Sequence, residues 1–244
     1  MKKLNFVIAI VAIFSLNACK KNNDTVDTPT AYTCVNCKTT PDAAASNNSS
    51  SKGIYKGVVI GSTGTIIFDI ANNSTAITAV MLIDGVTVNL TSTVTWVLGQ
   101  AYTAPFTGTL NGSTVTINFS VGLSGGTPIV ASSNIPGHPN ASIDIIKETS
   151  SNLVECFQGN YSTTLPETGT FNLIILRSLN RWTGIARKTG SITSNTGTGN
   201  IINNKLIDST QNNQAIGILN IDAVNGNFVD GNGRTVTLTG KRTL

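Results

Sequence analysis

Residues 79–90 read AVMLIDGVTVNL, two short runs of strand-forming residues separated by Asp84-Gly85. Neither run shows the spacing of three to four residues that an amphipathic helix requires. Aspartate and glycine both tolerate positive φ, so Asp84-Gly85 suits the two-residue type I′ turn that joins adjacent antiparallel strands. The stretch therefore predicts a β-hairpin.

The same signals recur from residue 53 to residue 244. Asn111-Gly112 separates FTGTL (106–110) from STVTI (113–117), which predicts a second hairpin of the same kind. Residues 90–98 alternate with period two and place Trp96 on the same face as Leu90, as expected for a strand with a buried face. No stretch of ten or more residues keeps a helical period with capping. We therefore expect an all-β fold, an antiparallel meander of many short strands that forms a barrel or a sandwich.

Two segments echo one another. Gly53-Ile54-Tyr55 and Gly159-Asn160-Tyr161 are each followed by Thr-Gly-Thr and an apolar run, and NGSTVTI (111–117) is matched by NGRTVTL (232–238). Such matches would arise either from a duplication of the sequence or by chance, because antiparallel hairpins use a small set of residue types. We expect two similar β meanders, 53–149 and 150–244, that form one body. Short strands, tight turns and a Gly-X-Tyr opening strand are faintly similar to avidin-like or lipocalin-like barrels.

The N-terminus combines Lys2 and Lys3, the apolar run FVIAIVAIF (6–14) and a short segment ending in Cys19, the three regions of a secretion signal. Nine helical residues reach ~14 Å, about half of the ~30 Å bilayer core, so we expect a removable segment. Leu16-Asn17-Ala18-Cys19 resembles the lipobox of bacterial lipoproteins. That resemblance implies that residues 1–18 are cleaved and that Cys19 is lipidated, which anchors the chain in a membrane. The alternative is an ordinary cleaved signal with a chance cysteine.

Residues 19–52 are rich in Thr, Asn, Ser and Ala and lack an apolar period, so we expect a flexible, disordered tether. Lys20 follows Cys19 where an aspartate would signal inner-membrane retention in some lipoproteins. We therefore expect an outer-membrane lipoprotein of the cell envelope, with its periplasmic or surface face left open. Asp24-Thr25-Val26 resembles the O-glycosylation triplet of some Gram-negative envelopes, which implies a modification at Thr25.

Cys34 and Cys37 form a CxxC pair in this segment. In an oxidising envelope they are expected to form a disulfide. Either Cys34 bonds to Cys37 and leaves Cys156 buried, or one of the pair bonds to Cys156. A zinc site would need all three cysteines and His138 to converge, so we predict neither a metal nor another cofactor.

Charged residues make up 11% of the chain, against ~25% in typical domains, and the net charge of +4 falls to +2 without Lys2 and Lys3. With aromatics at 6%, this composition argues against a nucleic-acid partner. No acid lies between Glu167 and Asp208. If FNLIILRS (171–178) pairs with RWTGIARK (181–188), a cationic patch could attract anionic glycans or lipid headgroups; its residues would be Arg177, Arg181, Trp182, Arg187 and Lys188. The alternative is solvated charges that deter strand aggregation.

The chain lacks the GxSxG, HExxH and phosphate-loop motifs, and its 12 acids and single histidine are scattered. Glu148 and Glu155 are the nearest approach to a carboxylate pair. The leading hypothesis is a non-catalytic, lipid-anchored envelope protein whose β body binds or presents itself to a protein or glycan partner. The alternatives are a small-ligand-binding β-barrel, which requires an interior cavity of several hundred Å³, and a glycan hydrolase, which requires two converging carboxylates.

Overall fold

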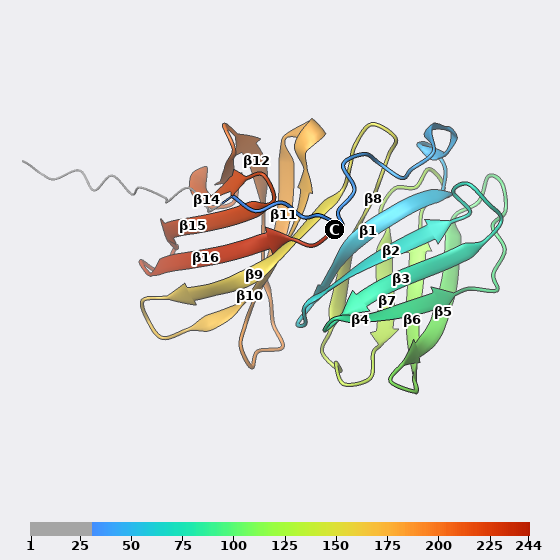
Figure 1. Ribbon diagram of the computed structural model, residues 1–244, viewed down its shortest axis with the longest axis horizontal. Helices are drawn as coiled ribbons and strands as arrows, with labels where there is room; N and C mark the ends of the chain where they lie inside the picture. Colours follow the sequence, from blue (N-terminus) through green and yellow to red (C-terminus); the bar gives the residue numbers. More distant parts are fainter. Residues whose placement is uncertain (1–30) are drawn as a thin grey trace, which may run out of the picture.

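The computed structural model describes residues 31–244, and these residues form two eight-stranded antiparallel assemblies side by side (Figure 1). Two short 3-10 helices, η1 (Ala45–Asn47) and η2 (Arg177–Leu179), are the helical elements of this part of the chain. The predicted all-β meander is confirmed. Cys19 and Thr25 lie outside the described residues. No helix within 31–244 is both long and apolar enough to cross a lipid bilayer.

The first half is a single curved sheet in the order β7-β6-β5-β4-β3-β2-β1-β8. Both predicted hairpin turns are present, with positive φ at Asp84 and Gly85 and at Asn111 and Gly112. The strands are β1 (Gly53–Ile60), β2 (Gly64–Ile70), β3 (Ile77–Ile83), β4 (Val86–Thr91), β5 (Tyr102–Leu110), β6 (Ser113–Val121), β7 (Ile129–Asn134) and β8 (Ser142–Lys147).

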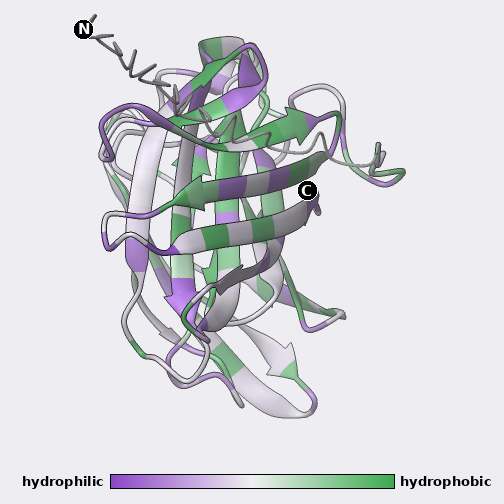
Figure 2. Ribbon diagram, turned by 90° about the vertical axis from the view of Figure 1, so that its left-hand side faces the viewer, coloured by the Kyte–Doolittle hydropathy of each residue, from purple (hydrophilic) through white to green (hydrophobic). Residues whose placement is uncertain are grey.

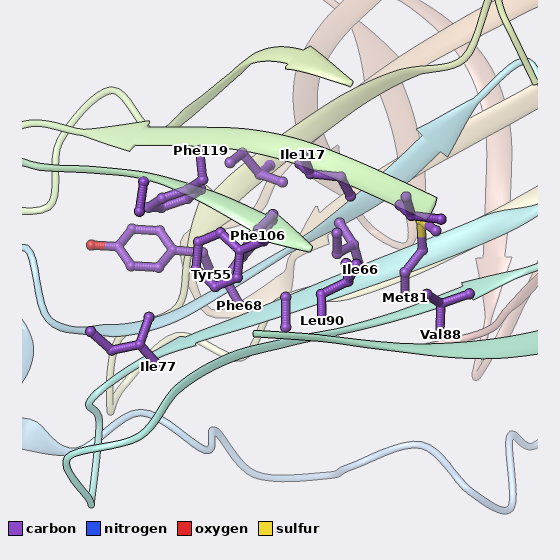
Figure 3. Close-up of a cluster of buried hydrophobic side chains, with 14 of the residues drawn as sticks. Tyr55, Ile66, Phe68, Ile77, Met81, Val88, Leu90, Phe106, Ile117 and Phe119 are labelled. Carbon is purple, nitrogen blue, oxygen red and sulfur yellow. The ribbon is translucent and has the colours of Figure 1, made fainter. Parts of the chain in front are cut away.

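The interior of the first half is filled by side chains. Tyr55, Phe68, Phe106 and Phe119 are fully buried, with neighbouring ring centroids between 4.6 and 6.1 Å apart (Figure 3). Aliphatic residues from β2, β3, β4 and β6 pack around these rings. Because the curved sheet wraps around large aromatic groups, this half has a solid core.

The second half is a closed barrel in which β9 pairs with both β10 and β16. Hydrophobic and hydrophilic residues alternate along its strands (Figure 2), as expected when one face points inward. The strands are β9 (Glu155–Thr163), β10 (Thr168–Leu176), β11 (Arg181–Lys188), β12 (Asn195–Ile202), β13 (Lys205–Asp208), β14 (Gln214–Asn220), β15 (Ala223–Val229) and β16 (Thr235–Arg242).

The two halves pack through β1, β9 and β10. A small apolar cluster between them is built around Val58 and Ile60 of β1, Ile174 of β10 and Cys156 of β9. The Cys156 thiol is free and fully buried, and Cys34 is bonded to Cys37 with a Cα–Cα distance of 5.3 Å. The first of the two predicted cysteine arrangements is therefore the one observed.

The prediction of a flexible tether is wrong for residues 31–52, which run across both halves (Figure 1, blue). Tyr32 forms a parallel bridge with Ile221 of the barrel, and Asp42 forms an ion pair with Lys56 at 3.1 Å. Asn47 is buried and donates to the carbonyl of Asn72 at 2.7 Å. Polar contacts hold this segment in place. Its order could therefore not be recognised from the sequence, in which only an apolar period would have signalled a folded element.

The strand predicted over residues 90–98 ends at Thr91. The β4–β5 ladder pairs Leu90 with Gly108 and Thr91 with Thr107, and the chain then leaves the sheet. Trp96 still packs against the core, and its Nε1 donates to Ser51 Oγ at 2.8 Å. Alternation without a partner strand was therefore insufficient to form β structure here.

The strand order of the first half is repeated in the second, but the two sequence matches do not follow this repeat. Tyr55 pairs with Phe68, whereas Tyr161 pairs with Gly169, the residue that the first echo equates with Gly64. The second echo matches β5–β6 of one half to β15–β16 of the other, and these hairpins hold different places in the strand order. The two echoes therefore do not mark equivalent positions.

Candidate functional site

The closed barrel of the second half, called the second barrel below, contains a cavity of about 320 Å³ at one end. It opens among the connections β9–β10, β11–β12, β13–β14 and β15–β16, which alternate along a meander and so gather at the same end. The opposite end of the barrel is filled by apolar side chains that are at most 5% exposed: Phe157, Ile175, Leu206, Leu219 and Val224. The barrel is therefore solid at one end and hollow at the other.

The wall of the cavity is apolar and aromatic. It includes Phe171 and Leu173 of β10, Trp182 of β11, Ile216 of β14 and Phe228 of β15. Alternation along each strand directs these side chains inward, as in other barrels. Such a wall favours the apolar body of a ligand.

Trp182 is accommodated by glycines on the neighbouring strands. A Cβ on Gly197 would lie 3.2 Å from Trp182 Cη2, and one on Gly199 would lie 3.0 Å from Trp182 Nε1. The indole Nε1 donates to the carbonyl of Ile207 at 3.2 Å. The small residues thus leave room for the indole and for the cavity beside it.

A chain of ion pairs forms part of the rim. Arg234 contacts Asp230 at 2.7 Å and Glu167 at 3.0 Å, and Lys188 reaches Glu167 at 3.5 Å. Burial opposes ionisation of Glu167, but the hydrogen bond from Tyr161 and the nearby cations outweigh it and hold the carboxyl pKa below its usual range. Burial, together with Glu167, raises the pKa of Tyr161 to about 12. The tyrosine is therefore a neutral hydrogen-bond donor at neutral pH.

Asp208 is the third acid of the cavity and is 3% exposed. It lies two residues after the buried Leu206 on β13, so both side chains point into the barrel. Its Oδ1 accepts hydrogen bonds from the backbone N–H of Thr210 at 2.7 Å and from the Thr210 hydroxyl at 2.6 Å. None of the ion pairs within residues 31–244 includes Asp208.

The predicted cationic patch does not form, although the pairing of 171–178 with 181–188 does occur as the β10–β11 hairpin. Trp182 points into the barrel, while Arg181 and Arg187 lie on the outer face because side chains alternate along β11. Arg181 and Lys188 are at opposite ends of this strand. Arg177 is bound to Glu155 at 2.6 Å.

Arg187 joins the two halves instead of facing an anionic partner. Its guanidinium donates to the carbonyl of Asn140 at 2.6 Å, to Ser142 Oγ at 3.3 Å and to Ser194 Oγ at 2.8 Å. A second cavity, of about 410 Å³, lies beside it and includes His138 in its lining. Because the guanidinium is engaged with both halves, we interpret Arg187 as a structural contact.

The two glutamates considered for hydrolysis are held in separate ion pairs. Glu148 contacts Lys56 at 2.7 Å, and Glu155 contacts Arg242 at 2.8 Å as well as Arg177. Neither glutamate lines the barrel cavity. Within the described range, no three His, Cys, Asp or Glu side chains are arranged to hold a metal ion. These contacts support the packing of the fold rather than a hydrolytic pair.

Comparison of the chain with protein-family models, with curated proteins and with solved structures finds no match. The cavity is therefore assessed on its own residues. Sequence reasoning identified Trp182 but placed it among cations and missed Glu167, Asp208 and Arg234 as a group. The signal that could have helped is the glycine-rich NTGTGN (195–200), since glycines in a strand often mark a close approach.

Proposed function

We propose that the second barrel binds a small amphipathic molecule in its open end, and that the protein acts as a non-catalytic binding protein of the cell envelope, anchored through a lipid on Cys19. The observation that carries this proposal is the contrast between the halves. The first core is filled by aromatic rings, whereas the second barrel keeps a cavity of about 320 Å³. Ligand sites commonly occupy the mouths of β-barrels.

The cavity suits a ligand with an apolar body and a polar end. Its deeper wall carries Phe171, Leu173 and Trp182, and its rim carries Glu167 and Arg234. The volume equals that of roughly ten liquid water molecules at ~30 Å³ each. A fused two-ring compound with a short polar substituent is of the corresponding size, and its transfer from water would be favoured by the loss of exposed apolar surface.

The position of the N-terminal segment is consistent with a lipid tether. Tyr32 contacts Ile221 in the β14–β15 connection, which lies at the filled end of the barrel. The cavity opens at the other end. A lipid at Cys19 would therefore attach through a segment that enters the body away from the cavity mouth, leaving the mouth accessible.

The partner-binding hypothesis and the hydrolase hypothesis stay predictions with weaker support. The surface proposed to attract an anionic glycan or lipid depended on a cationic patch, and its residues are dispersed over η2 and both faces of β11. The hydrolase hypothesis depended on convergent glutamates, which lie in separate ion pairs. The cavity therefore supports ligand binding best.

The binding proposal can be tested with N-phenyl-1-naphthylamine, an uncharged probe whose fluorescence rises in apolar surroundings. The full chain would carry Cys19→Ser, so that attached lipid does not compete for the probe. We expect saturable binding of one probe per chain. Ala186→Phe adds a ring inside the cavity and should weaken binding at least tenfold, whereas Ile202→Phe adds the same ring at an exposed position and should not. Equal binding by the two variants, or no saturable binding, would contradict the proposal.

The anchor can be tested separately. Cells expressing the unaltered chain or Cys19→Ser would be labelled with a radioactive fatty acid and fractionated. We expect label and membrane association for the unaltered chain alone. A Cys19→Ser chain that remains labelled and membrane-bound would refute lipidation at this residue.

A further inference from the structure

We propose that the ligand of the second barrel is an organic cation, an amine or quaternary ammonium on a flat apolar body, whose charged group contacts Asp208 and Trp182. This inference rests on the proposed binding function and specifies the chemical class of the ligand. Its basis is a buried carboxylate at the wall of an apolar cavity, which has no cationic partner within the described part of the chain.

The first step is the state of Asp208. Its side chain is turned into the barrel and is 3% exposed, yet among residues 31–244 its side-chain hydrogen bonds come from Thr210 alone. Both of these bonds go to Oδ1. Aspartate is almost never fully buried without a partner, because burial removes the water that stabilises its charge. A cationic ligand in the cavity would provide that partner.

The second step is the balance of charge around the cavity. Asp230 is bound to Arg234, and Glu167 is bound to both Arg234 and Lys188. Among the described residues, the carboxylates of the lining are Glu167, Asp208 and Asp230, whereas its one cation is Arg234. Since Arg234 is already held between two acids, an anionic ligand would meet an excess of negative charge. The lining therefore favours a positive ligand.

The third step is the space between carboxylate and indole. A point at the position of a Cβ on Gly197 lies 3.3 Å from Asp208 Oδ2 and 3.2 Å from Trp182 Cη2. Glycine leaves this position without a side chain, so Asp208 and Trp182 border the same opening. A cationic group in the cavity beside Gly197 could meet the carboxylate on one side and the aromatic ring on the other, and tryptophan is the strongest aromatic partner for cations.

A structural role for Asp208 predicts a different outcome. The bonds from Thr210 stabilise the connection between β13 and β14, and this local role needs an acceptor oxygen rather than a charge. Asp208→Asn retains such an oxygen and removes the charge. The substitution therefore separates support of the turn from recognition of a cation.

The test compares two probes of nearly the same shape, 2-naphthylmethylammonium and 2-naphthalenemethanol, binding to the full chain with Cys19→Ser by isothermal titration calorimetry. We expect the cation to bind about tenfold or more tightly than the alcohol, as for hydrogen bonds to charged groups. Asp208→Asn should remove that preference by weakening binding of the cation. Asp84→Asn, which removes an exposed acid from a turn of the first half, should keep the preference.

The outcomes separate the two proposals. Equal affinities of cation and alcohol in the unaltered cavity would overturn the inference while leaving the binding function intact. An equal loss of both probes in Asp208→Asn would assign Asp208 a structural role and would also overturn it. If neither probe binds in a way that Ala186→Phe prevents, the binding function itself fails.

Discussion

Lys56→Met should destabilise the protein strongly, because it removes the cation beside a fully buried carboxylate. Lys56 Nζ lies 2.7 Å from Glu148 Oε2 and 3.1 Å from Asp42 Oδ2, and the side chains of Lys56 and Glu148 are 1% and 0% exposed. Glu148 also accepts hydrogen bonds from the backbone N–H groups of Asp42 and Val154, at 2.7 and 3.1 Å. These bonds would remain in the variant and would hold the charge in place.

The expected magnitude follows from this geometry. Breaking a buried ion pair by removing one partner costs about 3–5 kcal/mol, since the remaining charge stays buried. The two retained backbone hydrogen bonds compensate part of the loss, so we expect about 3 kcal/mol. This is a large share of the ~5–15 kcal/mol that stabilises a typical domain. It should also loosen residues 31–52, because Asp42 loses one of its contacts to the body.

The assay is equilibrium unfolding in urea, followed by circular dichroism and by the fluorescence of Trp96 and Trp182, one in each half. Combining Lys56→Met with Glu148→Gln removes the orphaned charge, keeps an acceptor oxygen for the backbone N–H groups and should recover part of the loss. Lys188→Met is the control, because that ion pair involves a side chain 58% exposed and should contribute less than about 1 kcal/mol. A loss below about 1 kcal/mol for Lys56→Met, or a double variant less stable than the single one, would refute the reasoning.

Three further predictions concern the thiol, the strand contacts and acid stability. Burial raises the pKa of Cys156 to about 12, so iodoacetamide at pH 8 should leave this thiol unmodified in the native protein and alkylate it in urea. Mass spectrometry would measure the modification, and rapid labelling of the native protein would contradict the burial of the thiol. Gly57→Ala should lower the unfolding free energy by about 1–3 kcal/mol or more, because its Cβ would lie 1.9 Å from a carbonyl oxygen of β8. Gly231→Ala is the control and should be nearly neutral, since no neighbouring atom lies within 4 Å of its Cβ. Similar urea midpoints for the two variants would refute this prediction. Burial opposes ionisation of Asp42, but hydrogen bonds from two lysines outweigh it and lower the pKa of its carboxyl. The contribution of Asp42 to folding stability is therefore complete above about pH 3.8 and disappears as the pH falls through the lower native pKa. Asp42→Asn should weaken the loss of stability on acidification, and an unchanged acid profile would count against this ion pair.

The hairpins could be predicted because their signals are local. Asp84-Gly85 and Asn111-Gly112 each combine residues that tolerate positive φ with flanking strand formers, and both turns form as expected. The same local reasoning failed at Trp96, because alternation does not show whether a partner strand continues. It also failed for residues 31–52, which are ordered by polar contacts such as Asn47 with Asn72, between residues distant in sequence.

By itself the sequence determined the fold class, the two hairpin turns and the division into two meanders, because strand alternation and turn chemistry act over a few residues. The tertiary structure alone decided that the first core is solid and the second hollow, since this depends on how side chains from eight strands meet in one interior. The tertiary structure also places acidic side chains in the cavity beside Trp182, where the sequence predicted a cluster of cations. Glu167, Asp208 and Asp230 are far apart in the chain, and closure of the barrel brings them to one cavity, while alternation along β11 directs its arginines away.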